Sequence, residues 1–172
     1  MNQDFLNDYF ANTWKGSFNE YLYSGYALVD KIQPNEWVLD VGCGWNNFKD
    51  KIPNLVGIDP AGMGADITVG IDEYKPSRLF DVAFCLGSIN FGDEDRIVKQ
   101  IEKVVACLKP WGRIYWRCNP GLKDHGNNRV VQVEFFDWSF EKQAEMADRF
   151  GFKIAEMRWD QGKRIYAEWI RI

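Results

Sequence analysis

Short runs of β-forming residues alternate with stretches of helical periodicity along the chain of 172 residues. Strands are predicted at residues 37–41, 55–58, 66–69, 81–86, 113–118, 153–159 and 164–170. The first five are predicted to be parallel with crossover connections, whereas residues 160–163 leave room only for a tight antiparallel turn. The pattern predicts an α/β fold: a doubly wound, mostly parallel seven-stranded sheet with an antiparallel C-terminal hairpin strand and helices on both faces.

The predicted helices carry their own start and stop signals. Ser17 and Glu20 have the spacing of a capping box, in which each side chain satisfies a free backbone amide at the helix start. Asp93 is a predicted N-cap, and an apolar stripe at helical spacing follows it. Ser139 is a second N-cap, for a helix that Gly151 ends by taking a left-handed conformation.

The composition is that of one globular domain. Hydrophobic residues make up 46% of the chain and aromatic residues 16%, enough for a sizeable core. The formal net charge is −4. An excess of acid gives no general attraction to phosphate backbones or anionic lipids, so neither nucleic acid nor a membrane is the first partner to expect.

The cysteines and the N-terminus indicate a reducing compartment. Four cysteines lack Cys-x-x-Cys spacing and only one histidine is present, so no metal site is expected. The N-terminal stretch MNQDFLNDYF has no signal-peptide pattern. No apolar run approaches the roughly 20 residues of a membrane span. We therefore expect a cytoplasmic protein.

The stretch DVGCGWNNF, at residues 40–48, indicates a ligand site. A strand that ends near Asp40 is followed by Gly42 and Gly44, which lack side chains and can take positive φ, so that a ligand can lie against the backbone. Asp59 follows nineteen residues later, at the end of the next predicted strand. A carboxylate at that place binds the two hydroxyls of a ribose. Taken alone, the glycine pattern is equally compatible with a plain tight turn.

Two kinds of nucleoside cofactor fit this geometry. A dinucleotide needs its pyrophosphate on a helix N-terminus, usually reached through Gly-x-Gly-x-x-Gly. Here Asn47 stands at the third glycine position, and Asp40 would repel a phosphate. The same charge suits a ligand with an ammonium and a sulfonium, such as S-adenosylmethionine, and a nicotinamide cofactor is the weaker alternative.

The motifs together resemble the class I S-adenosylmethionine-dependent methyltransferases over roughly residues 20–172. The matching segments are VLDVGCGWNNF at 38–48, GID at 57–59, ADI at 65–67, FDVAFCLGS at 80–88, LKPWGRI at 108–114 and FGF at 150–152. They stand in the family's order and spacing. The resemblance implies a Rossmann-like sheet of seven strands.

The resemblance also implies which residues would bind the cofactor. They are Asp40, Gly42, Cys43 and Gly44 along the methionine moiety, Asp59 and Pro60 at the ribose, Asp66 and Ile67 at the adenine, and Cys85, Leu86, Gly87 and Ser88 beside the reactive methyl. The chain departs from the family at Asn46, where glycine is usual, and at Trp45, which would narrow the pocket. Asparagine tolerates left-handed φ, so the turn can survive.

Two further features suggest roles in catalysis. His125 is a candidate general base because its unperturbed pKa lies near neutrality, although a lone histidine in a polar loop is more often simply solvated. The N-terminal aromatic residues are either the packing face of an amphipathic segment or a lid over the site. They are Phe5, Tyr9, Phe10, Trp14, Tyr21, Tyr23 and Tyr26.

We therefore expect one methyltransferase-like domain over residues 1–172, with an N-terminal helical segment at 1–33 as a possible lid and a Rossmann-like core at 34–172. The expected activity is methyl transfer from S-adenosylmethionine to an unidentified acceptor. A small molecule is favoured over a protein side chain, and a nucleic acid comes last. The alternative is a non-catalytic accessory or sensor protein that binds the same cofactor.

Overall fold

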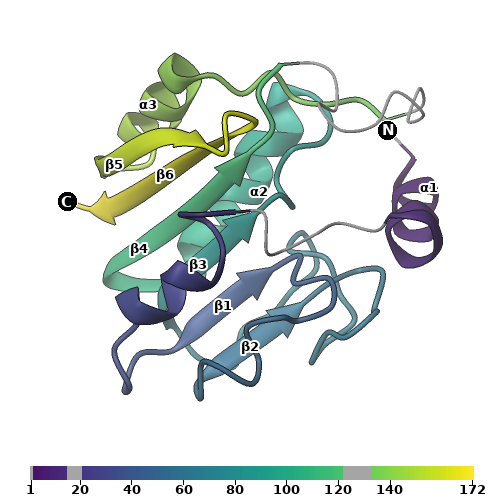
Figure 1. Ribbon diagram of the computed structural model, residues 1–172, viewed down its shortest axis with the longest axis horizontal. Helices are drawn as coiled ribbons and strands as arrows, with labels where there is room; N and C mark the ends of the chain where they lie inside the picture. The colour runs from purple at the N-terminus through teal and green to yellow at the C-terminus, as the bar shows by residue number, and fades with distance from the viewer. Residues whose placement is uncertain (1, 15–20, 122–132) are drawn as a thin grey trace.

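One mixed sheet runs through the molecule. Its strands are β1 Val38–Val41, β2 Leu55–Ile58, β3 Phe80–Leu86, β4 Leu108–Cys118, β5 Phe152–Asp160 and β6 Arg164–Arg171. They lie in the order β2-β1-β3-β4-β6-β5 in the computed structural model, which describes residues 2–14, 21–121 and 133–172 (Figure 1). β1 to β4 pair in parallel, and β6 is antiparallel to both of its neighbours. The predicted C-terminal hairpin is confirmed.

The sheet has six strands in the described part of the chain, and the seventh strand predicted at residues 66–69 is reduced to a single bridge. Ile67 pairs in parallel with Ile58. Only residues 59–66 lie between these two partners, which is too short for the dozen or more residues of a parallel crossover. The segment therefore folds straight back onto the edge of β2, and the backbone amide of Asp66 donates to the carbonyl of Gly57 at 2.9 Å.

Two helices begin where the sequence predicts, at Asp93 and Ser139, whereas the predicted capping box of Ser17 and Glu20 lies outside the described residues. α2 spans Glu94–Ala106 and α3 spans Phe140–Arg149. The side chain of Asp93 accepts a hydrogen bond from the amide of Arg96 at 3.0 Å, and that of Ser139 accepts one from Lys142 at 3.0 Å. Each N-cap thus satisfies an amide that the helix itself leaves free.

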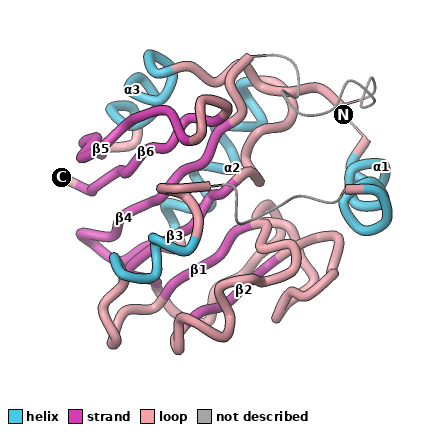
Figure 2. Tube along the Cα trace, viewed as in Figure 1, coloured by secondary structure: helices cyan, strands magenta, loops and turns pink. Residues whose placement is uncertain are grey.

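The two faces of the sheet are covered unequally. α2 and α3 both pack on one face, in a cluster that contains Ile101 and Met146 (Figure 2). On the other face, the described residues contribute the short 3-10 helix η3, Tyr26–Lys31, and the turns that follow β1. The prediction of helices on both faces holds only in this weaker form, because the chain between β2 and β3 makes no crossover helix.

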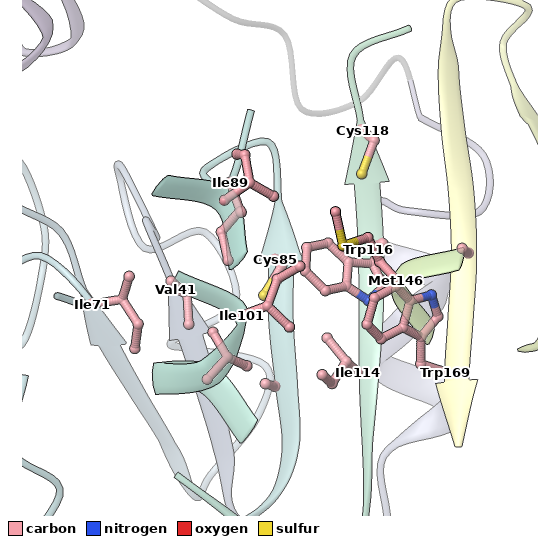
Figure 3. Packing of buried hydrophobic residues seen from close by; sticks show 14 of the residues in the cluster. Val41, Ile71, Cys85, Ile89, Ile101, Ile114, Trp116, Cys118, Met146 and Trp169 are labelled. Atoms are coloured by element: carbon pink, nitrogen blue, oxygen red, sulfur yellow. The ribbon is translucent and has the colours of Figure 1, made fainter. Parts of the chain in front are cut away.

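The central strands are buried on both sides. Alternate residues of β4 enter opposite clusters, with Ile114 and Trp116 on the α2/α3 face and Tyr115 on the other. Figure 3 shows the rings of Trp116 and Trp169 in contact beside Met146, and their centroids lie 4.7 Å apart. Such near-continuous burial is typical of parallel sheets covered on both faces.

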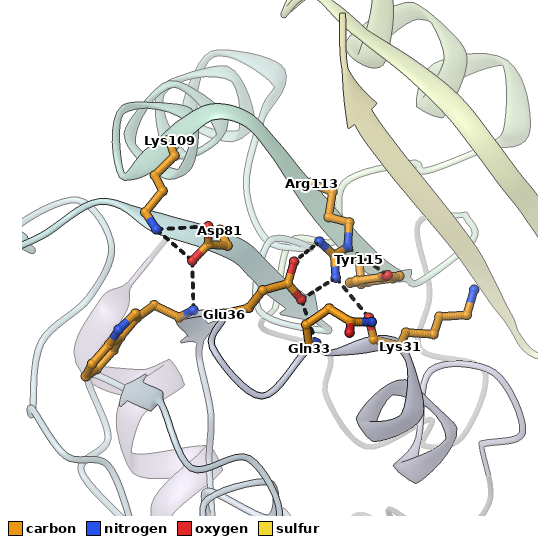
Figure 4. A network of polar contacts seen from close by, with 8 residues as sticks. Lys31, Gln33, Glu36, Asp81, Lys109, Arg113 and Tyr115 are labelled. Carbon is orange, nitrogen blue, oxygen red and sulfur yellow. Dashed lines mark hydrogen bonds and ion pairs between the residues drawn. The ribbon is translucent and has the colours of Figure 1, made fainter.

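Ion pairs tie the amino ends of the strands together (Figure 4). Arg113 donates to both carboxylate oxygens of Glu36, at 2.6 and 2.8 Å, and these bonds hold the pKa of Glu36 below its usual value. Lys109 pairs with Asp81 at 2.9 Å, and Asp81 also accepts from the amide of Trp37. This edge of the sheet is therefore filled by the chain's own contacts, which leaves the carboxyl edge for a ligand.

Candidate functional site

The turn after β1 crosses the carboxyl ends of two neighbouring strands. The amides of Gly42 and Cys43 both donate to the carbonyl of Ile58 at the end of β2, at 2.8 and 3.0 Å. Gly42 has φ +69°, and a Cβ there would lie 2.3 Å from the Cβ of Ser88, just beyond β3. Gly44 also takes a positive φ, of +54°. Gly42 thus allows a close approach that a residue with a side chain could not make, and both glycines supply the positive φ of the turn.

Asp59, directly after β2, is hydrogen-bonded to this turn. One carboxylate oxygen accepts from the amide of Gly44 at 2.9 Å, and the other accepts from the amide of Ala61 at 2.7 Å. The side chain is buried. The structure therefore brings together the glycine turn and the acid that the sequence places at the two strand ends.

Asn46 occupies the position where the resembling family has glycine. Its φ is +56°, so the left-handed conformation that the sequence analysis expects is confirmed. Its side-chain amide donates to the carbonyl of Gly64 at 3.1 Å. The side chain lies so close to Gly57 that a Cβ there would come within 2.7 Å of it. Asparagine thus replaces glycine without loss of the turn, and holds the next loop in place.

A cavity of about 920 Å³ opens at this edge of the sheet. Its floor consists of the glycine turn, Asp59, and the end of β3 with the segment that follows it, from Leu86 to Phe91. Its opposite wall comes from α1, Gln3–Asp8, and the π-helical turn η1, Tyr9–Thr13. Figure 1 shows α1 beyond the arrowheads of β1 and β2. The volume suits a ligand of drug size or larger.

The N-terminal segment contacts the core through side chains of α1 and η1. Arg96 of α2 donates to the side chain of Gln3 at 2.5 Å. The rings of Phe10 and Phe91 lie 5.6 Å apart in an edge-to-face arrangement. The segment therefore faces the strand ends across the cavity.

Asp40 places a carboxyl group in the cavity wall. Burial raises the pKa of Asp40 to about 7, the charge of Arg117 acts in the opposite direction, and Asp59 adds to the rise. Nearby, the hydroxyl of Ser88 is buried without a hydrogen-bond partner in the described part of the chain. Burying either group without a partner costs free energy, because a buried polar atom or charge needs a hydrogen-bond or ionic partner. A bound cation and a polar ligand atom would supply these partners.

Three of the predicted cofactor residues lie outside the cavity: Asp66, Ile67 and Cys85. Asp66 accepts from the amide of Gly57 at 2.8 Å and pairs with Lys49 at 2.7 Å, on the far side of the turn. Cys85 points into the α2/α3 core. The other nine predicted residues line the cavity: Asp40, Gly42, Cys43, Gly44, Asp59, Pro60, Leu86, Gly87 and Ser88.

Ile71 and Asp72 were not predicted as site residues. Both line the cavity, and Asp72 accepts a hydrogen bond from Gln100 of α2 at 3.1 Å. The sequence carried a signal for them. Gly70-Ile71-Asp72 repeats the sequence Gly57-Ile58-Asp59, and it begins three residues after Ile67.

The remaining predictions concern a general base and a metal. His125 lies outside the described residues. Among residues 2–14, 21–121 and 133–172, no group of three or more histidine, cysteine, aspartate or glutamate side chains could hold a metal ion. In the same residues, no helix has both the length and the apolar character to cross a membrane.

Solved structures share this architecture at low sequence identity. A Synechocystis PCC 6803 magnesium protoporphyrin IX methyltransferase with bound S-adenosylmethionine superposes with a TM-score of 0.70 at 13% identity, covering 98% of this chain and 96% of that one. A Burkholderia thailandensis 1,6-didemethyltoxoflavin-N1-methyltransferase with bound S-adenosylhomocysteine superposes with a TM-score of 0.69 at 14% identity. The match covers 98% of this chain and 85% of that one. A Clostridium acetobutylicum S-adenosylmethionine-dependent methyltransferase superposes with a TM-score of 0.63 at 14% identity, and the match covers 98% of this chain and 97% of that one.

The chain has the class I S-adenosylmethionine-dependent methyltransferase fold. The sequence matches no protein-family model and no curated protein. In this methyltransferase fold the cavity lies where parallel strands of an α/β sheet bind ligands, outside their carboxyl ends.

Replacing Gly42 tests the close approach on which the site is built. Gly42→Ala should lower the free energy of unfolding by about 1–2 kcal/mol through its positive φ and by a further roughly 1–3 kcal/mol through overpacking against Ser88. Gly151→Ala is the matched control, because Gly151 has φ +75° but nothing within 4 Å of an added Cβ. Urea denaturation measures both. Equal losses in the two variants would show that the contact with Ser88 is unimportant.

Proposed function

We propose that the protein is an S-adenosylmethionine-dependent methyltransferase that acts on a small molecule. The observation that carries the proposal is the joint placement of the glycine turn and Asp59 at the floor of a cavity large enough for a nucleoside and an acceptor. The neighbouring structures support the cofactor, since two of those described hold S-adenosylmethionine or S-adenosylhomocysteine. Both of these neighbours are named for small-molecule acceptors.

The residues present fit the cofactor. Gly42, Cys43 and Gly44 offer bare backbone for the methionine moiety, and buried Asp40 would pair with its ammonium. Asp59 and Pro60 would hold the ribose; each carboxylate oxygen of Asp59 accepts one bond from the chain, and an oxygen of this kind has a second lone pair. Ile71 and Asp72, in place of Ile67 and Asp66, would hold the adenine. Leu86, Gly87 and Ser88 would lie below the reactive methyl.

The chain's own contribution to such a reaction is alignment and exclusion of water. When bound, the cofactor supplies a methyl group activated by a sulfonium. Holding that carbon in line with an acceptor atom can contribute about 7–11 kcal/mol. No nucleophile is required of the protein, and a general base is needed only where the acceptor must lose a proton. His125 remains the candidate for that step.

The N-terminal segment, residues 1–33, would act as the lid of a core formed by residues 34–172. Its described part lines the cavity through Gln3, Leu6 and Phe10. The Gln3–Arg96 hydrogen bond and the Phe10–Phe91 ring contact tie it to the core. Closing this wall over the ligands would remove water from the reacting groups.

The non-catalytic alternative loses its main support. It rested on Asn46 and Trp45 as possible damage to the glycine turn, and on the absence of an evident catalytic group. Asn46 instead completes the turn, and Trp45 is 57% exposed at the cavity rim, where it leaves the floor open. Catalysis is therefore the preferred function.

Calorimetric titration with S-adenosylhomocysteine, combined with transfer of labelled methyl from S-adenosylmethionine into a metabolite extract, tests the proposal. We expect binding, and labelling of small molecules. Asp59→Asn and Asp72→Asn should each weaken binding by about tenfold or more, since a hydrogen bond to a charged group contributes roughly 1.5–3 kcal/mol. Asp66→Asn, outside the cavity, is the matched control and should bind normally.

Each other outcome has a distinct meaning. Binding without any labelled product would favour a sensor. Absence of binding would refute the proposed function. A loss of affinity in Asp66→Asn but not in Asp72→Asn would restore the adenine assignment made from the sequence.

The affinity for S-adenosylhomocysteine should also depend on pH through Asp40. The bound ammonium favours the ionised carboxylate, so binding weakens as protonation of Asp40 competes below pH 7. With a pKa of about 7, affinity at pH 6 should be about tenfold lower than at pH 8. Asp40→Asn should bind more weakly and lose this dependence. An unchanged pH profile in Asp40→Asn would assign the titration to another group.

A further inference from the structure

Asn90 is a buried polar side chain in the cavity wall that has no part in the proposed cofactor site. It lines the cavity, yet only 4% of it is exposed. Its Oδ1 accepts a hydrogen bond from the backbone amide of Asn119 at 3.0 Å. Because a backbone amide can only donate, this bond fixes the orientation of the side-chain amide, and Nδ2 is the atom left for another partner.

Nδ2 of Asn90 is a hydrogen-bond donor that the described part of the chain leaves unused. It makes no hydrogen bond to residues 2–14, 21–121 or 133–172, and it is not among their fully buried unpartnered atoms, which indicates that it reaches the cavity surface. A Cβ added to Gly87 would lie 3.9 Å from this nitrogen. The donor thus stands beside the segment proposed to lie below the reactive methyl.

The backbone around Asn90 is held in place by hydrogen bonds to a distant segment. The amide of Phe136 donates to the carbonyl of Asn90 at 2.8 Å, and the amide of Gly92 donates to the carbonyl of Glu134 at 2.8 Å. Both the side chain and the backbone of Asn90 are therefore fixed before a ligand arrives. A preorganised donor of this kind costs little to order on binding, and an accepting atom of the ligand would satisfy it.

Aromatic rings line the same cavity. Phe10, Trp14, Phe91 and Phe135 form this aromatic wall. Their ring centres form a continuous series, at 5.8 Å for Phe10–Trp14, 5.6 Å for Phe10–Phe91 and 5.3 Å for Phe91–Phe135. Such a wall favours a flat, apolar ligand body, because aromatic rings stack and pack edge-to-face on one another. Phe91 directly follows Asn90, so the donor and the wall can contact one ligand.

We infer that the methyl acceptor is a flat aromatic molecule that carries a carbonyl or hydroxyl oxygen. The oxygen accepts a hydrogen bond from Nδ2 of Asn90, and the ring packs on the aromatic wall. Asn90 is a specificity-determining residue in this arrangement, because a site with a buried donor rejects analogues that lack the accepting atom. The inference rests on the proposed function, since it assigns the acceptor side of the same cavity.

Equilibrium dialysis of the full chain saturated with S-adenosylhomocysteine tests the inference with three flat probes at pH 8. Chromone carries a carbonyl oxygen and no donor, 2-naphthol carries a hydroxyl, and naphthalene carries neither. Asn90→Ala should weaken the binding of chromone, 2-naphthol or both by about fivefold or more, and that of naphthalene much less. The probe that loses affinity distinguishes a carbonyl from a hydroxyl acceptor.

Asn90→Asp separates the lost donor from a lost fold. Its carboxylate can still accept from the amide of Asn119, but it donates no hydrogen bond when ionised. Chromone should therefore lose about fivefold or more, whereas 2-naphthol should lose less because its hydroxyl can donate to the carboxylate. Asn54→Ala is the control, because Asn54 donates to the carbonyl of Pro34 at 3.1 Å outside the cavity, and it should leave all three affinities unchanged.

Phe135→Leu tests the aromatic wall. It should weaken the binding of all three probes, naphthalene included, by roughly threefold through the lost ring contact. Phe140→Leu is the matched control, because the ring of Phe140 packs edge-to-face on Trp159 outside the cavity.

The outcomes separate the two claims. If S-adenosylhomocysteine binds but no probe does, or if the Asn90 variants weaken the oxygen-bearing probes no more than naphthalene, the acceptor assignment is wrong and the proposed function stands. Unchanged binding in Phe135→Leu would refute the aromatic acceptor. Loss of S-adenosylhomocysteine binding in both Asn90 variants would make Asn90 a structural residue and overturn its assignment. If the unaltered protein does not bind S-adenosylhomocysteine, both claims are wrong.

Discussion

The close approach of the turn after β1 to the segment after β3 is the constraint on which the site depends. Gly42 meets Ser88 at a distance that excludes any side chain, and its amide bonds to the last carbonyl of β2. The ends of β1, β2 and β3 are thereby held together, and Asp59 stabilises the arrangement by accepting a hydrogen bond from the amide of Gly44. With a larger residue at position 42, the turn would move away from β3, and the floor of the cavity would separate from the acids that line it.

The positions of the charged side chains in the site follow from the face of the sheet on which each strand residue lies. Asp40 and Arg117 lie on the face opposite the α2/α3 cluster, since their strand neighbours Leu39 and Trp116 belong to that cluster. Asp40 stands on β1 beside the glycine turn, and Arg117 stands on β4 beside Gly87. A donor carrying positive charge would thus be drawn to the β1 side of the cavity, where Asp40 lies.

Much of this arrangement is visible in the sequence because local chemistry decides it. N-caps at Asp93 and Ser139, the tight turn at residues 160–163, and the glycines after β1 each act within a few residues. The placements that differ from the prediction depend on a contact outside the local pattern. Gly57 lies on an edge strand whose outward amide needs an acceptor, and Asp66 supplies it. That bond turns Asp66 away from the cavity, and no local sequence pattern predicts the bond.

A crystal structure of the protein with S-adenosylhomocysteine tests the central claim, that the glycine turn and Asp59 form a nucleoside site, most directly. The account predicts the ribose hydroxyls within hydrogen-bond distance of Asp59, the adenine beside Ile71, and the thioether sulfur above Gly87. A ligand bound elsewhere, or a cavity closed by the chain's own side chains at saturating ligand, would contradict it.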